Sequence, residues 1–219
     1  AEDSLRYRAE RDLLTGLYNR TTFYELAAEM VAAHEPGYYV LACFDIDKFK
    51  VVNDQYGHET GDQVLRNVGE TAKEMFASIG GICCRVYADN FAAIYPNTPE
   101  NNALVVQIRE QKSKKNSTGQ YLNVSVGRNV IDDTALPISV VHDRAAIAKA
   151  SVKGQYGLNV AYYSNDMRES ILREQEVTQQ MGEALEQKQF EVWYQPQYDL
   201  SNDALIGAEA LVRWRHPEK

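Results

Sequence analysis

The spacing of apolar residues predicts alternating helices and strands over residues 12–164. Apolar side chains that recur every three or four positions predict helices at about 20–35, 61–78, 101–112 and 138–150. Continuous or alternating apolar runs predict strands at 38–44, 82–86, 91–95, 121–130 and 159–163. This alternation around one sheet indicates a layered α/β (α+β) domain.

The flanking residues predict pieces of larger elements. Residues 1–11 are polar and charged, as in a helix that arrives from an upstream segment, and residues 165–188 predict a charged connector helix. Within residues 189–219, two strands joined by a turn at 201–203 are predicted. Because a two-stranded hairpin is not stable alone, we expect it to belong to a larger domain.

Composition excludes some classes of function. The chain has 219 residues, of which 44% are hydrophobic, so residues 12–164 can bury a core. The net charge of −8 argues against a nucleic-acid partner, since binding of the phosphate backbone needs clustered Lys and Arg. A small nucleotide is compatible with this charge if metal ions screen its phosphates.

The cysteines and the hydropathy indicate a cytoplasmic chain. Cys43, Cys83 and Cys84 lie in apolar runs and lack metal-ligand spacing, which predicts buried, reduced thiols. No apolar run approaches the roughly 18 residues of a membrane span. We expect no membrane contact for this chain, while a longer parent protein could still carry an anchor.

Two polar stretches could bind a nucleotide and a metal. Residues 44–54 place carboxylates and lysines at a strand end, which suits hard cations and a triphosphate, although such residues are also common in solvated turns. Residues 56–62 lead into a helix. There Asp62 is either a helix cap or, together with Asn53, a partner for a purine edge. A third stretch, 85–91, is an ordinary hairpin turn when read alone.

The order of these stretches resembles the GGDEF (diguanylate cyclase-like) family. Residues 12–20 resemble the opening D-x-L-T-G-L-x-N-R, and residues 44–54 and 57–62 are similar to F-D-I-D-x-F-K-x-x-N-D and G-H-x-x-G-D. Residues 87–91 stand where G-G-D-E-F is expected. Further on, Y-Q-P-Q at 194–197 and E-A-L-V-R-W at 209–214 are similar to the first segments of EAL cyclic-di-GMP phosphodiesterase domains.

The resemblance implies a central, mostly antiparallel sheet flanked by helices, in a nucleotide-cyclase (ferredoxin-like) fold. Active members bind one GTP per protomer, and two facing protomers make cyclic di-GMP, so a homodimer and Mg²⁺ or Mn²⁺ bound with the nucleotide are implied. The implied metal ligands are Asp45, the carbonyl of Ile46, and Asp89. The implied nucleotide-binding residues are Asn53 and Asp62 for guanine, and Lys50 and Lys153 for phosphate, with Lys149 left as an alternative to Lys153.

The signature departs from the family pattern. It reads Tyr87-Ala88-Asp89-Asn90-Phe91, so both glycines are replaced and a carboxylate becomes a neutral amide at Asn90. Loss of a positioned charge in such a site costs about 100-fold in rate or more. Asp89 and Asn90 are therefore expected to form an impaired catalytic pair. The family's inhibitory R-x-x-D motif is also absent, since the corresponding residues are 78–81.

The EAL-like segment holds only part of a site. Glu209 resembles a metal ligand of that family, and Gln195 and Arg213 resemble substrate contacts. The other expected site residues lie beyond Lys219, in the rest of the EAL domain. We expect no phosphodiesterase activity from this chain itself, and expect the phosphodiesterase to be the working enzyme of the parent.

Three hypotheses follow. The first is a regulatory module that binds GTP, or a related guanine nucleotide, and changes the output of the following phosphodiesterase through the connector helix. The second is a low-activity diguanylate cyclase. The third is a structural or dimerisation module whose site residues survive only as caps and turns.

Overall fold

The computed structural model describes residues 2–110, 123–155 and 159–216. The chain forms two compact units, Ala1–Met167 and Arg168–Lys219. Within the described residues, none of the helices is both long and apolar enough to cross a bilayer.

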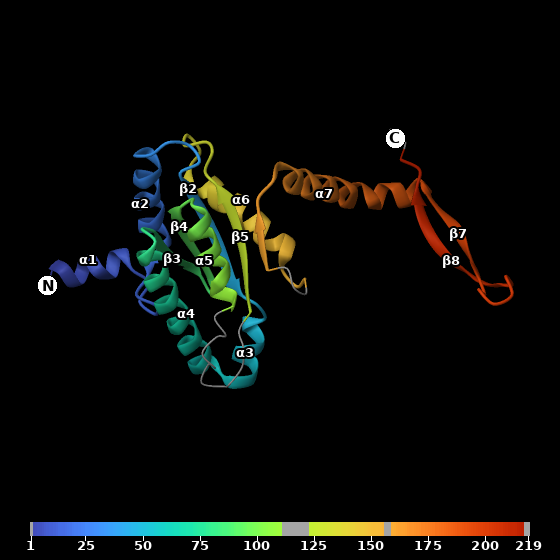
Figure 1. Ribbon diagram of the computed structural model, residues 1–219. Coiled ribbons are helices and arrows are strands. Elements are labelled where there is room, and N and C mark those ends of the chain that lie inside the picture. The colour runs from blue at the N-terminus through green and yellow to red at the C-terminus, as the bar shows by residue number, and fades with distance from the viewer. Residues whose placement is uncertain (1, 111–122, 156–158, 217–219) are drawn as a thin grey trace. The chain divides into compact units, whose positions relative to one another are not determined.

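The first unit is built on one six-stranded sheet (Figure 1). Its strand order is β1-β3-β4-β2-β5-β6, with antiparallel pairing in the centre and parallel pairing of β1 and β6 at the edges. The strands are β1 (Tyr18–Asn19), β2 (Tyr39–Ile46), β3 (Ile82–Tyr87), β4 (Asn90–Pro96), β5 (Val124–Val130) and β6 (Val160–Tyr162). The expected mostly antiparallel sheet is confirmed.

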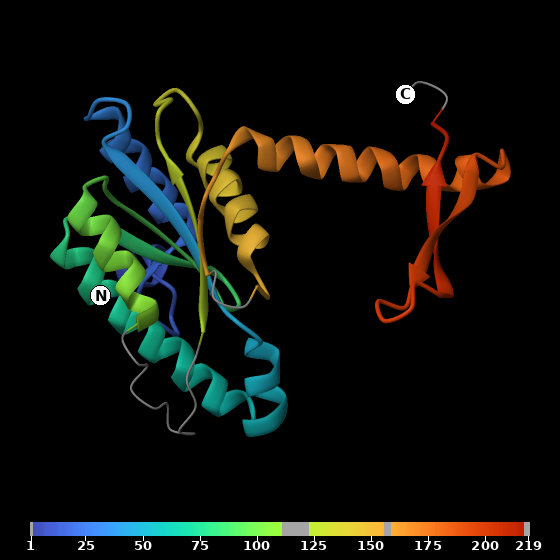
Figure 2. The ribbon, with the colours of Figure 1, turned by 45° about the vertical axis from the view of Figure 1, so that its right-hand side comes forward.

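Helices cover both faces of this sheet, with α2 (Arg20–Ala32) and α6 (Ile138–Val152) on one and α4 (His58–Ser78) and α5 (Pro99–Glu110) on the other (Figures 1 and 2). The unit also contains α1 (Glu2–Glu10), and α3 (Phe49–Tyr56), which contacts α4. All eight residues of β2 are buried, because alternate side chains enter two cores. Val40 and Phe44 pack with α4 and α5 residues, whereas Leu41 and Cys43 pack with α2 and α6. The continuous apolar run of this strand therefore reflects its place between two helical layers.

The structure differs from the predicted elements at the end of β2. The strand continues through Ile46, so Asp45 lies inside the sheet and not in a turn. Residues 49–56 form α3, a helix that was not predicted because only Val52 among them is buried. α4 begins at His58, three residues earlier than expected. The β3–β4 turn is also tighter than predicted, since Tyr87 pairs with Asn90 across it.

The second unit contains a helix and a hairpin. α7 (Asn165–Glu186) begins at the end of the first unit, and β7 (Phe190–Tyr198) pairs with β8 (Leu205–Trp214) in antiparallel register. Both strands expose large apolar side chains: Val192, Trp193, Tyr194, Tyr198, Leu205, Ile206 and Val212. Such exposure is what a hairpin shows when further protein is needed to cover it.

All three cysteines are free and buried, as predicted. Burial raises the pKa of both Cys43 and Cys83 to about 12. These thiols therefore stay protonated at neutral pH and act as small apolar side chains in the core.

Candidate functional site

The sheet register brings the first and third polar stretches together. Asp45 on β2 pairs directly with Asn90 on β4, and with Ser125 on β5 on its other side. The fourth position of the altered signature therefore lies beside the carboxylate at the end of β2. Asp45 is only 3% exposed, so its charge must be compensated by close partners.

Two lysines from the end of α6 supply that compensation. The Nζ of Lys153 lies 2.7 Å from Oδ2 of Asp45, and the Nζ of Lys149 lies 3.0 Å from the same oxygen. The other oxygen, Oδ1 of Asp45, is buried without a hydrogen-bond partner among the described residues. The sequence did not decide between Lys149 and Lys153 as the expected phosphate-binding lysine. In the structure, both of them contact this carboxylate.

Lys149 also contacts the altered signature. Its ammonium donates a hydrogen bond of 2.5 Å to Oδ1 of Asn90, and the residue is 8% exposed. The amide of Asn90 therefore serves as a neutral acceptor for a buried ammonium. We call Asp45, Asn90, Lys149 and Lys153 the lysine cluster.

Gly127 on β5 allows α6 to lie close enough for this contact. A Cβ at this position would collide with the backbone carbonyl of Ala145 and the backbone nitrogen of Lys149. α6 therefore packs directly on the backbone of β5, which fixes the position of the Lys149 backbone relative to the sheet.

Hydrogen bonding to Asp45 raises the pKa of Lys153, against the opposing effect of burial. The charges of Asp45, Asp89 and Asp47 act in the same direction as the hydrogen bond. Asp89, the retained signature carboxylate, is therefore within electrostatic range of this ammonium. Lys153 carries its positive charge throughout the neutral pH range.

The signature hairpin has a strained turn. Ala88 adopts φ 45°, in the left-handed region that favours glycine, and it stands where the family has glycine. The preceding Tyr87 is 63% exposed. The side chain of Arg85 stabilises the turn, since its Nε donates a 2.7 Å hydrogen bond to the carbonyl of Ala88.

Arg85 ties this hairpin to the opening motif. Its Nη1 lies 3.3 Å from both carboxylate oxygens of Asp12, which also accepts hydrogen bonds from the backbone and hydroxyl of Thr15. Burial opposes a low pKa for Asp12, but the Thr15 hydrogen bonds and the Arg85 charge outweigh it and lower the pKa. Sequence reasoning missed this support, although an acid in the opening motif and an arginine beside the hairpin were both visible.

The second polar stretch is held by α3 and α4. The amide of Asn53 lies against Gly61, where a Cβ would collide with its Oδ1. Asp62 follows at the next position of α4 and is partly buried, whereas Lys50 is exposed on α3. The structure thus places Asn53 beside the residue that precedes Asp62.

The residues present do not match a metal-ion site. No three His, Cys, Asp or Glu side chains gather around a common point in the part of the chain that the structure describes. Of the expected ligands, Asp45 already receives two ammonium groups on one oxygen, Ile46 is a buried strand residue, and the charge of Asp89 acts on Lys153. A divalent cation placed here would lie beside two positive charges, which disfavours its binding.

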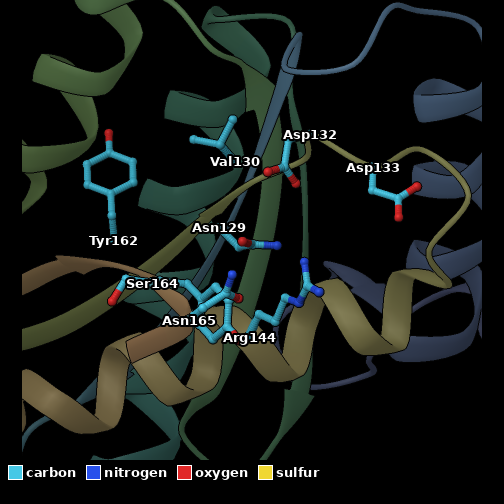
Figure 3. Close-up of a pocket in the computed structure, with 9 residues that line it drawn as sticks. Asn129, Val130, Asp132, Asp133, Arg144, Tyr162, Ser164 and Asn165 are labelled. Carbon is cyan, nitrogen blue, oxygen red and sulfur yellow. The ribbon is translucent and has the colours of Figure 1, made fainter. Parts of the chain in front are cut away.

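A separate cleft of about 490 Å³ lies at the end of β5 and β6 (Figure 3). The side chains that line it include Asn129, Asp132, Arg144 and Tyr162. None of the predicted site residues takes part in it, so this cleft is distinct from the site that the motifs predicted.

The predicted residues of the EAL-like segment share one face of the β7–β8 hairpin. Gln195 pairs with Glu209, and Arg213 lies four residues further along β8, so alternation along the strands places all three on the same side. All three residues are exposed. Their register is compatible with a common site, of which the hairpin supplies one wall.

Comparison with known proteins identifies both parts of the chain. The family model described as "Diguanylate cyclase, GGDEF domain" matches residues 9–156, and the EAL domain model matches residues 178–219. The Pseudomonas aeruginosa protein "Cyclic di-GMP phosphodiesterase NbdA" is 29% identical over 225 residues, covering 99% of this chain and 28% of that protein. The chain thus spans less than a third of this curated relative.

Solved structures give the same result for the fold. The coiled coil and GGDEF domain of DgcB from Caulobacter crescentus, crystallised in complex with c-di-GMP, is 29% identical, with a TM-score of 0.62. That match covers 74% of this chain and 89% of the DgcB chain. The S helix-GGDEF-EAL structure of Vibrio cholerae LapD, bound to c-di-GMP, covers 99% of this chain and 51% of its own, with 21% identity and a TM-score of 0.69.

Proposed function

Because the chain belongs to the GGDEF family and continues into an EAL segment of a cyclic-di-GMP signalling protein, we propose that its GGDEF domain is a regulatory module that binds GTP or a related guanine nucleotide. The observation that carries this proposal is a contrast within one site. Positions 53, 61 and 62 keep the family residues. At position 90, by contrast, asparagine replaces the signature carboxylate, and its amide oxygen accepts a hydrogen bond from Lys149.

The retained residues suit a guanine base. Guanine offers N–H donors and a carbonyl acceptor on one edge, which a carboxylate and an amide can satisfy together. Gly61 leaves the space into which the Asn53 amide fits. At the other end of the site, Lys153 supplies positive charge for phosphate, and Lys50 is a second, exposed cation on α3.

In the whole protein, we propose that this binding changes the activity of the EAL phosphodiesterase through α7. The helix begins at Asn165, three residues after β6 ends. A nucleotide-dependent change in the position of β6 would therefore move the start of α7. Assaying the full-length protein for cyclic-di-GMP hydrolysis with and without GTP tests this step. An unchanged rate at saturating GTP would contradict it.

Calorimetric titration of the 219-residue chain with GTP tests nucleotide binding. We expect saturable binding, with ATP weaker by about 10-fold or more because the base-reading groups would be left unpaired. An Asn53→Ala variant should lose about 10-fold in GTP affinity and most of the preference over ATP. Absence of binding at millimolar GTP would contradict the proposal and leave a structural or dimerisation role.

A second candidate, a low-activity diguanylate cyclase, is favoured by the retention of Asp45 and Asp89. It requires two protomers that face each other, each with one GTP. Product formation distinguishes this candidate from a binding module, because the latter leaves GTP intact.

A further inference from the structure

The lysine cluster contains a buried ammonium at the point where the signature meets β2. Lys149 has 11% of its side-chain surface exposed and contacts two oxygens, Oδ2 of Asp45 at 3.0 Å and Oδ1 of Asn90 at 2.5 Å. One oxygen belongs to Asp45, an expected metal ligand, and the other to Asn90, the signature position where the family carries a carboxylate. The ammonium therefore lies directly on one of the groups that would otherwise bind a cation.

The buried carboxylate in this cluster is already neutralised. Asp45 is paired with the ammonium groups of Lys149 and Lys153, while the charges of Asp89 and Asp47 act on Lys153 from outside the cluster. At nucleotide sites, Mg²⁺ is usually bound by one or two carboxylates together with the phosphates of the substrate. A divalent ion would have to displace the two ammonium groups from Oδ2 of Asp45, or bind Oδ1 of the same carboxylate beside their two positive charges.

We propose that Lys149 takes the place of the divalent cation, so that this domain binds its guanine nucleotide without a metal ion. This inference rests on the proposed function and specifies the form of the ligand: a nucleotide whose phosphates are met by ammonium groups alone.

The two lysines divide the work. An ammonium has three N–H donors, and Lys149 uses two of them on Asp45 and Asn90. Lys153 uses one on Asp45, and half of its side-chain surface is exposed, so it has donors available for a phosphate. Lys149 thus neutralises the carboxylate and orders the signature, while Lys153 contacts the ligand.

Paired calorimetric titrations test the inference directly. GTP is titrated into the 219-residue chain in excess EDTA and in excess Mg²⁺ at matched ionic strength. We expect the two dissociation constants to agree within about threefold, since no metal takes part. A Lys149→Met variant should bind about 10-fold more weakly in EDTA, and Mg²⁺ should restore part of that loss. Lys73→Met, at an exposed position of α4, serves as the matched control and should bind like the unaltered chain.

A second variant keeps the test informative if Lys149→Met fails to fold. Asn90→Glu restores a carboxylate beside Asp45 and should make GTP binding stronger in Mg²⁺ than in EDTA by about 10-fold. Circular dichroism establishes that each variant is folded before titration.

The outcomes separate the two proposals. Binding that requires Mg²⁺ in the unaltered chain would overturn the metal-free inference and leave nucleotide binding intact. An Asn90→Glu variant that still binds equally in both buffers would also overturn the inference. Absence of binding in either buffer would instead overturn the proposed function itself.

Discussion

The two ends of the candidate site differ in what holds their residues in place. At the proposed guanine end, formed by Asn53, Gly61 and Asp62, the Asn53 amide packs against a glycine. At the proposed phosphate end, formed by the lysine cluster and Asp89, Asp45 is buried in ion pairs with two lysines. Retention of Asp45 is thus explained by the stability of the fold. Retention of Asn53 is not, so Asn53 is the better indicator of a ligand.

This difference also shows that the two ends can change separately. The signature hairpin belongs to β3 and β4, whereas the guanine end belongs to α3 and α4. The asparagine at position 90, which replaces the family carboxylate, is contacted by Lys149 of α6. This replacement does not involve the packing of Asn53 on Gly61. A domain of this kind can lose its chemistry and keep a binding function.

Removing the charge of Asp45 tests the structural role at the phosphate end. Asp45→Asn leaves the buried ammonium of Lys149 without its counter-charge, and we expect a loss of about 3 to 5 kcal/mol in unfolding free energy. Urea denaturation measures this loss. The double variant Asp45→Asn with Lys149→Met should recover a large part of it. A loss below about 1 kcal/mol would show that Asp45 is not held mainly by these ion pairs.

Adding a methyl group at Gly61 tests the guanine end. Gly61→Ala forces the Asn53 amide to move, because the new Cβ would overlap its Oδ1. GTP affinity should fall by about 10-fold, or about 1.4 kcal/mol. Calorimetry gives the affinity. Gly182→Ala on α7, where a Cβ meets nothing, is the matched control and should leave binding unchanged. Equal affinity for Gly61→Ala and the unaltered chain would argue against Asn53 as a base contact.

Restoring glycine in the hairpin separates strain from function. Ala88 has φ 45°, so Ala88→Gly should raise the unfolding free energy by about 1 kcal/mol. The reverse sign is expected for Ala28→Gly in the exposed interior of α2, which should lose about 1 kcal/mol. Urea denaturation of both variants gives the comparison. A destabilised Ala88→Gly would mean that the turn is not strained.

The support of the hairpin by Asp12 should appear as a pH dependence. Because the pKa of Asp12 is lowered in the folded state, its stabilisation is present above the ordinary value of about 4 and is lost as the pH falls through the lowered value. The stability difference between the unaltered chain and Asp12→Asn should therefore shrink from pH 6 to about pH 3. Solvent screening keeps it below about 1 kcal/mol. A difference that does not change with pH would exclude an electrostatic role.

Much of the fold could be predicted from the sequence. The continuous apolar run at 38–44 identified a buried strand, which the structure extends over Tyr39–Ile46, and the ordered motifs identified the sheet and the hairpin. α3 was missed because only one of its side chains, Val52, is buried, which gives no periodic signal. Residues 111–122 were expected to hold the end of one helix and the start of one strand, and they lie outside the described residues.

The site could be predicted only where its residues are close in the sequence. Asn53 and Asp62 belong to adjacent motifs, so their resemblance to the family was visible. The contact of Lys149 with Asn90 joins residues 59 positions apart, and that of Arg85 with Asp12 joins residues 73 positions apart. Such pairs depend on the packing of α6 on β5 and of the opening motif under the hairpin, which periodicity does not encode.

Once calorimetry has measured GTP binding to the chain, the absence of turnover is tested most directly by chromatography of a single reaction. The chain is incubated at high protein concentration, which favours dimers, with saturating GTP and Mg²⁺, and the nucleotides are then separated. Intact GTP, with no cyclic di-GMP above a protein-free control, is the expected result. Accumulation of cyclic di-GMP at a rate proportional to the concentration of dimer would contradict it. The domain would then be a working cyclase.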